Sequence, residues 1–208
     1  MVAKSDNDIS ASENSTALRP VLIVLAGTAG AGKTTLYESK LKAVFPSLLK
    51  ASASPMEQAE TDRERVRLVK EGHSFVYQDT TIDAGAIRQV QEAGYDVKAF
   101  YISTEDPNLN MGRVLLRVNN GGPFAALARI PDDYAQGLKQ LSEVKQLADD
   151  LMLFDNTING RGHRLVAHFH DGELMKLARS VPKWAQKVFG KDFEKWIGTH
   201  ERGPGRGR

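Results

Sequence analysis

The chain has 208 residues, and its 28 basic and 26 acidic residues leave a net charge of +2 at pH 7. This length suits one domain with a core that needs no staples, and the absence of cysteine excludes disulfides, thiolate catalysis and cysteine-based zinc sites. The balanced charge argues against nucleic-acid binding, and the apolar runs are too short to span a bilayer, so we expect a cytoplasmic protein without a membrane partner.

The two ends of the chain differ in composition from the part between them. Residues 1–19 are rich in Ser, Asp and Asn and are expected to form a disordered leader. Residues 201–208 (ERGPGRGR) read as a flexible basic tail. From 20 to 200, short apolar runs alternate with helical patterns, which predicts a single α/β domain with a mostly parallel sheet flanked by helices.

The predicted elements follow one another in a regular order. Residues 21–26 (VLIVLA) are continuously apolar, as in a buried central strand. A glycine-rich turn leads into a helix over about 33–43. The elements expected after it are a charged helix over 56–71, a strand over 74–78, an apolar helix stripe over 82–93, a strand over 97–102, a helix from about Pro107, a loop over 119–130, a helix over 134–148, strands over 151–154 and 165–169, and terminal helices around Trp184 and Trp196.

The glycine-rich turn carries the strongest motif. Gly27-Thr28-Ala29-Gly30-Ala31-Gly32-Lys33-Thr34 fits G-x-x-x-x-G-K-[ST], and Thr35 follows it. Successive N–H groups of such a loop surround phosphate oxygens at a helix N-terminus, Lys33 reaches the β and γ phosphates, and the Thr34 hydroxyl coordinates Mg²⁺. The loop therefore predicts ATP and Mg²⁺ as cofactors, and no N/T-K-x-D guanine signature is found. The alternative is an ordinary glycine-rich strand-to-helix turn.

An acidic residue ends the second predicted strand. In open α/β sheets ligands collect outside the carboxyl ends of the strands, which places Asp79, Thr80 and Thr81 at the site. We predict that Asp79 is catalytic and organises the metal or the acceptor, with Thr80 and Thr81 on the substrate side. The alternative is a helix N-cap made by Thr81 or Asp83.

Two arginines precede a glycine pair. Arg113 and Arg117 are four residues apart and share one helix face, just before Gly121 and Gly122. This pattern predicts a helical lid whose arginines stabilise charge during catalysis, with Arg129 as a further substrate-side candidate. The alternative is a pair of solvated surface arginines.

Two other polar groups have weaker interpretations. His168 and His170 alternate along a strand, and without a third ligand they are interpreted as structural. Asp155 and Asn156 follow a strand, where they form a turn or contact the nucleotide.

Several of these pieces occur together and in order. They are the phosphate loop, Asp79-Thr80-Thr81-Ile82, Gly94-Tyr95, Arg113-Val114 with Arg117-Val118, Gly121-Gly122, Tyr134 and Phe154-Asp155-Asn156. In this combination the chain resembles the zeta toxin family of P-loop kinases over about residues 21–184. The resemblance implies ATP-dependent phosphorylation of a sugar nucleotide such as UDP-N-acetylglucosamine in a bacterial cytoplasm. It also implies an antitoxin partner that blocks the nucleotide site.

The sequence departs from the family pattern in three places. The family has an Asn-x-Asp segment after the first helix, whose Asp acts as the base, whereas here the stretch reads LKASA over 49–53 and no Asp occurs between Lys33 and Asp62. The family's Gly-Gly-His is Gly-Gly-Pro at 121–123, and its Arg-Tyr pair is Asp133-Tyr134. Three hypotheses therefore stay open: a kinase of zeta toxin type, a nucleotide-binding module without transfer, and a kinase for another metabolite.

Overall fold

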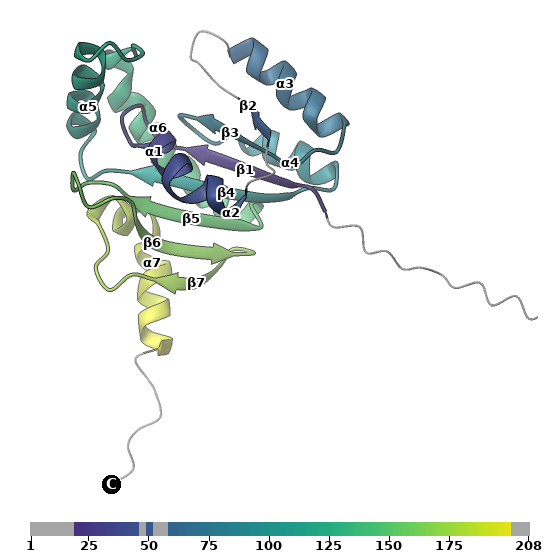
Figure 1. Ribbon diagram of the computed structural model, residues 1–208. Helices are drawn as coiled ribbons and strands as arrows, with labels where there is room; N and C mark the ends of the chain where they lie inside the picture. The colour runs from purple at the N-terminus through teal and green to yellow at the C-terminus, as the bar shows by residue number, and fades with distance from the viewer. Residues whose placement is uncertain (1–18, 46–48, 52–57, 201–208) are drawn as a thin grey trace, which may run out of the picture.

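One twisted sheet runs through the molecule in the computed structural model, which describes residues 19–45, 49–51 and 58–200 (Figure 1). Within these residues the strand order is β2-β3-β1-β4-β5-β6-β7. The first five strands in this order are parallel, and β6 and β7 are antiparallel additions. The strands are β1 (Val21–Ala26), β2 (Leu49–Ala51), β3 (Phe75–Asp79), β4 (Asp96–Ser103), β5 (Asp150–Asp155), β6 (Arg164–His170) and β7 (Glu173–Leu177).

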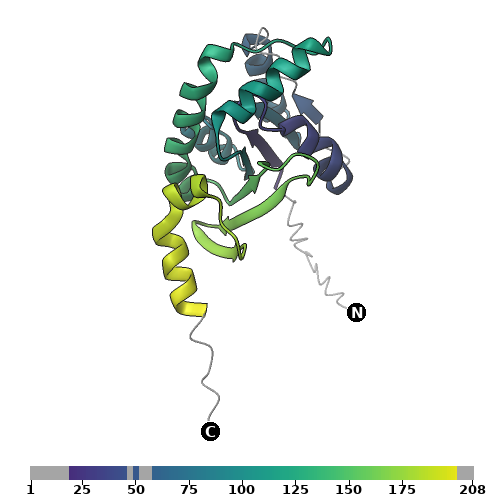
Figure 2. The ribbon, with the colours of Figure 1, turned by 90° about the vertical axis from the view of Figure 1, so that its left-hand side faces the viewer.

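Helices cover both faces of the sheet. Figure 1 shows α5 beyond the carboxyl ends of the central strands. Figure 2 shows α7, in yellow, extending away from the sheet. The helical elements are α1 (Lys33–Leu36), η1 (Tyr37–Leu41), α2 (Lys42–Val44), α3 (Gln58–Lys70), α4 (Ala84–Glu92), α5 (Pro107–Asn119), η2 (Leu127–Arg129), α6 (Ile130–Leu147) and α7 (Lys183–His200). No helix among the described residues is long and apolar enough to cross a membrane.

The centre of the sheet fixes the position of the glycine-rich turn. Strand β1 is buried from Leu22 to Ala26 and pairs with β3 on one side and β4 on the other. A strand buried on both faces needs apolar side chains throughout, which explains its unbroken apolar run. The strands that flank β1, β3 and β4, lie on opposite sides of it, which makes its carboxyl end the position where open α/β sheets bind ligands. The turn after Ala26 lies at this end.

The predicted fold class is confirmed, with differences in detail. The helix expected over 33–43 extends to Val44 but contains a π turn, η1. In this turn the Ser39 hydroxyl donates to the Thr35 carbonyl oxygen at 2.6 Å, a local side-chain bond that commonly bends helices. Helix α6 begins at Ile130 rather than at Tyr134, and the short helix η2 directly precedes it. The irregular segment before α6 is therefore shorter than the predicted loop over 119–130.

Two strands escaped prediction, and the chain ends are not described. Strand β2 has only three residues, and the edge strand β7 lacks a buried stripe. The leader and the tail lie outside the described residues except for Arg19. Its guanidinium donates to the carbonyl oxygens of Gly94 and Tyr95 and forms an ion pair with Asp96 at 2.7 Å.

Candidate functional site

The glycine-rich loop adopts a backbone that side chains would prevent. Gly27, Gly30 and Gly32 have φ angles of 139°, 82° and 102°, all in the region that favours glycine. A methyl group on Gly27 would also collide with the carbonyl oxygen of Ile102 on β4. The loop therefore lies directly against the sheet and leads straight into α1, the arrangement that offers free N–H groups to an anion.

The lysine at the start of α1 lies over its own loop. The Lys33 ammonium donates to the carbonyl oxygens of Gly27 and, at 3.4 Å, Thr28. Burial lowers the pKa of Lys33 to about 8; Asp79 opposes this effect and the Arg117 guanidinium adds to it. Lys33 thus stays largely protonated at pH 7 while bonded only to neutral carbonyls, which leaves its charge available to an anion.

The acidic strand end lies beside the loop. Asp79 pairs in register with Ala26, the last residue of β1, and accepts a hydrogen bond from the Thr80 amide at 2.6 Å. The Thr34 hydroxyl donates to Oε1 of Gln78 at 3.3 Å, so α1 and the end of β3 are in contact. Hydroxyl and carboxylate oxygens are the ligands that Mg²⁺ prefers, and Thr34 and Asp79 fit such an ion.

The residues after Asp79 divide between the site and the next helix. Thr81 is half-buried and follows Asp79 and Thr80 at the carboxyl end of β3. Asp83 provides the N-cap of α4, since its carboxylate accepts from the Gly85 amide at 2.8 Å. The capping alternative therefore applies to Asp83 rather than to Thr81.

The three predicted arginines have different surroundings. The Nε of Arg117 is buried and makes no hydrogen bond to the described residues. Gly122 lies so close to the Arg117 side chain that a methyl group there would collide with it. Arg129 is 77% exposed and reaches Asp133 at 3.7 Å. Of the three, Arg117 is the one whose guanidinium lies near Lys33 without an anionic partner.

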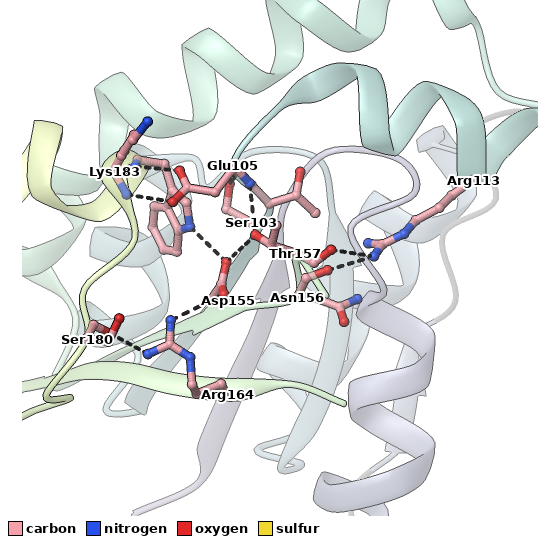
Figure 3. A network of polar contacts seen from close by, with 11 residues as sticks. Ser103, Glu105, Arg113, Asp155, Asn156, Thr157, Arg164, Ser180 and Lys183 are labelled. Atoms are coloured by element: carbon pink, nitrogen blue, oxygen red, sulfur yellow. Dashed lines mark hydrogen bonds and ion pairs between the residues drawn. The ribbon is translucent and has the colours of Figure 1, made fainter. Parts of the chain in front are cut away.

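Arg113 is bonded to protein acceptors instead (Figure 3). Its guanidinium donates to the Asn156 carbonyl oxygen at 2.7 Å, and it also donates to Oδ1 of Asn159 at 2.6 Å. These contacts join α5 to the loop between β5 and β6. The two arginines on one helix face thus have different surroundings, although their spacing is that of a pair: Arg113 is bonded to protein acceptors, and the Arg117 guanidinium lies near Lys33.

Buried donors without partners gather at this loop. Thr28 Oγ1, Asn110 Nδ2 and Arg117 Nε are buried and make no hydrogen bond to the described residues. Thr28 belongs to the glycine-rich loop, and Asn110 lies in α5 where its backbone touches Gly30. An unsatisfied buried donor is costly and needs an explanation. All three atoms are closed to solvent, so an anion at the loop would reach them only after these side chains move, and the fit to a triphosphate rests on the motif and on the backbone of the loop.

The remaining polar candidates have structural partners. Asp150 accepts from Nε2 of His168 at 2.7 Å and Nδ1 of His170 at 3.1 Å, and the described residues contain no group of three or more His, Asp or Glu that could hold a metal. The structural interpretation of the two histidines agrees with these contacts. Asp155 turns toward α7, where it accepts from the Trp184 indole at 3.3 Å (Figure 3).

Three polar residues at the loop were missed or left undecided by the sequence. Asn110 and His163 had no motif to mark them, and Asn156 was noted only as a turn residue or nucleotide contact. The Asn156 side chain donates to the Ala31 carbonyl oxygen at 2.7 Å, and Nε2 of His163 lies 3.0 Å from the Gly32 carbonyl oxygen. Only the strand-end position of Asn156 could have pointed to it.

A cavity lies elsewhere in the molecule. It has a volume of about 370 Å³ and lies between α6 and α7, with Tyr134, Leu138 and Trp184 among its lining residues. None of its lining residues belongs to the glycine-rich loop. This cavity is therefore separate from the glycine-rich loop.

Comparisons with known proteins place the fold. No family model and no curated protein matches the sequence. A chain of the AvrRxo1-ORF1:-ORF2 complex with ATP is similar in structure, with a TM-score of 0.65 and 15% identity. That match covers 82% of this chain, which spans 63% of the matched chain. A chain of the PezAT chromosomal toxin-antitoxin system of Streptococcus pneumoniae has a TM-score of 0.53 and 17% identity, covering 92% of this chain and 89% of that one. These similarities show that the chain shares its fold with both of these proteins.

Proposed function

We propose that this chain is an ATP-dependent kinase that phosphorylates a hydroxyl group of a small molecule in the cytoplasm. The observation that carries the proposal is the glycine-rich loop at the carboxyl end of β1, whose glycines have positive φ angles and whose Lys33 ammonium is bonded only to neutral carbonyl oxygens of the loop. Free loop amides and a cation at the start of a helix form a site for an anion with several oxygens. A triphosphate has the charge and the oxygen atoms to occupy it.

The residues of the site divide into three roles. Loop amides from Gly27 to Thr35 bind the phosphates, and Lys33 and Arg117 stabilise the charge on the transferred group. Thr34 and Asp79 would hold Mg²⁺, which neutralises phosphate charge when bound. We also assign Asp79 a hydrogen bond from the acceptor hydroxyl, and its position at the end of the strand next to β1 supports this role.

Positioning accounts for much of phosphoryl transfer, so a dedicated base is not a condition for activity. This matters because the stretch in which the resemblance implies a base has no carboxylate, and residues 52–57 lie outside the described residues. Thr80, Thr81 and Arg129 are proposed for the acceptor side. The sequence resemblance supports a sugar nucleotide such as UDP-N-acetylglucosamine as the acceptor.

The test is acceptor-dependent ADP release. Purified protein is incubated with Mg²⁺, ATP and a panel of sugar nucleotides and simple sugars, and ADP and the phosphorylated product are both quantified. We expect product with at least one acceptor and its loss in Lys33→Ala. Lys187→Ala serves as the control, because Lys187 is exposed on α7. ADP release that no acceptor increases would contradict the proposal.

A second candidate function is nucleotide binding without transfer. Asp133 favours it, because this carboxylate on α6 is only 18% exposed and lies near Lys33, where a cation would favour phosphate binding. This module would bind ATP and release no ADP. Turnover that disappears in Lys33→Ala would exclude it.

An antitoxin is proposed as the protein partner. The PezAT chain comes from a toxin-antitoxin system, and the AvrRxo1 chain was crystallised in a complex. A protein that covers the glycine-rich loop would compete with ATP. Loss of MgATP binding on addition of a candidate antitoxin would support this partner, and unchanged binding in a stable complex would contradict it.

A further inference from the structure

Three consecutive carbonyl oxygens of the glycine-rich loop are held by side chains from outside it. Asn156 Nδ2 donates to the Ala31 oxygen at 2.7 Å, and Nε2 of His163 lies 3.0 Å from the Gly32 oxygen. Nη1 of Arg113 lies 3.5 Å from the Gly30 oxygen, a weaker contact. Asn156 and His163 are at the two ends of the loop between β5 and β6, which we call the clamp loop (156–163).

Peptide geometry links these contacts to anion binding. In a planar trans peptide the carbonyl of one residue and the N–H of the next point in opposite directions. Holding the Ala31 and Gly32 oxygens toward the clamp loop therefore directs the amides of Gly32 and Lys33 to the other side. These amides precede the first intrahelical hydrogen bond of α1, so they are available to a ligand.

The glycine at position 32 makes the close approach possible. A methyl group there would lie 2.8 Å from Nε2 of His163 and would collide with the Asn156 amide nitrogen. The φ angle of 102° adds a second reason for glycine. Gly32 thus serves the clamp as well as the phosphate.

His163 is buried and fastened to its surroundings. It is 6% exposed, and its own carbonyl oxygen accepts from the Lys40 ammonium at 3.0 Å. A carbonyl oxygen only accepts, so the contact with Gly32 requires the proton on Nε2. Burial lowers the pKa of His163, which keeps the ring neutral at pH 7 in that tautomer.

The clamp loop also reaches α5. The Asn156 carbonyl oxygen accepts from Arg113 at 2.7 Å (Figure 3). Asn159 Oδ1 accepts from the same guanidinium at 2.6 Å. Arg113 therefore acts through the clamp loop and is a positioning residue in this arrangement. The loop connects α5 and the glycine-rich loop through side chains that need not touch the nucleotide.

We propose that Asn156 and His163 are positioning residues that hold the glycine-rich loop in its phosphate-binding conformation. Without them the loop glycines have many alternative conformations, and binding a triphosphate must first select one. This inference deepens the proposed kinase function and rests on the same site. It adds a second requirement for nucleotide affinity, a hydrogen-bond donor at position 163.

The test measures affinity for MgATP and for magnesium tripolyphosphate by calorimetry at 10 °C, alongside thermal unfolding. The variants are His163→Ala, His163→Gln and Asn156→Ala, with His73→Ala as the control, because His73 is in an exposed turn. We expect both alanine variants at the clamp to weaken both ligands about fivefold to tenfold, the effect of one hydrogen bond. His163→Gln keeps a donor and should bind within about twofold of the wild type.

Each result decides the proposal. Alanine variants that bind both ligands as tightly as the wild type overturn it, even if they unfold at lower temperature, because the residues then serve stability alone. A folded His163→Gln variant that binds both ligands no more tightly than His163→Ala also overturns it. Wild-type protein that binds tripolyphosphate but not ATP contradicts the kinase function. The affinities of the variants for tripolyphosphate then decide the clamp proposal. A wild type that binds neither overturns both.

Discussion

At the scale of single residues, Lys33 combines a structural cost with a binding role. Its ammonium is half-buried beside Arg117, and both effects disfavour the charged form. Its recorded hydrogen bonds go to neutral carbonyls of its own loop. The Lys33 ammonium therefore gives up only hydrogen bonds to neutral oxygens when it moves to a phosphate. The negative charge of the phosphate then stabilises the protonated form of Lys33.

The lowered pKa of Lys33 makes nucleotide binding depend on pH. Free protein loses this proton around pH 8, whereas the bound phosphates raise the pKa again, so binding above pH 8 must take up a proton. We expect MgATP affinity to fall by up to about tenfold per pH unit above 8. Calorimetry in buffers of different ionisation enthalpy should show almost no proton uptake at pH 6.5 and close to one proton at pH 9. A proton count that stays at zero at pH 9 would contradict this role.

At the scale of elements, the sheet contains a polar cluster far from the glycine-rich loop. Lys98, His168 and His170 from β4 and β6 all contact the carboxylate of Asp150 on β5. Burial alone would raise the pKa of Asp150, but these donors lower it to about 2. The carboxylate of Asp150 thus stabilises the junction between the parallel strands and the antiparallel hairpin.

Replacing this carboxylate should destabilise the protein in a pH-dependent way. Asp150→Asn leaves three donors without a charged acceptor, so we expect a loss of about 1 to 2 kcal/mol in the free energy of unfolding at pH 5. The folded pKa lies below the unfolded value of 3.8, so the contribution is complete above pH 4 and is lost as pH falls toward 2. The hydrogen bond to Asp150 raises the pKa of His170, so the contribution of this pair to stability is largest below pH 6.5.

Urea unfolding of the wild type and of Asp150→Asn at pH 5 and pH 3 measures the difference in their free energies of unfolding. Asp171→Asn is the matched control, because Asp171 is 73% exposed and contacts only the outer side of His170 at 3.6 Å. The control should change stability by less than about 0.5 kcal/mol. A difference between Asp150→Asn and the wild type that is equal at both pH values would refute the assignment.

The elements also show what sequence reasoning could reach. The apolar run of β1 and the motif after it specified the central strand and the loop, because both are local patterns. Strand β7 and the clamp loop were out of reach, since pairing with β6 and contact with Gly32 are decided by residues distant in sequence. The spacing of Arg113 and Arg117 predicted a shared face but not the contacts of Arg113, which depend on the position of Asn159.

At the scale of the whole molecule, one ligand would connect three separate segments. The glycine-rich loop meets α5 and the clamp loop through contacts of Gly30, Ala31 and Gly32 with Arg113, Asn156 and His163, and Arg113 also joins α5 to the clamp loop. The far side of the sheet, with β7 and α7, is packed by its own aromatic cluster. Ligand binding should therefore tighten one end of the molecule and leave the other unchanged.

Thermal unfolding and hydrogen exchange test this division. A ligand at a hundred times its dissociation constant stabilises the folded state by about 2.7 kcal/mol. For a chain of this length that corresponds to a rise of about 5 to 10 °C in the unfolding temperature. With MgATP we expect this rise in the wild type and none in Lys33→Ala. Amide protection should increase over residues 27–36, 107–122 and 156–163, while residues 173–177 and 190–200 exchange as before. Equal protection at both ends of the molecule would show that binding acts on the whole fold, and the connection through the clamp loop would then be wrong.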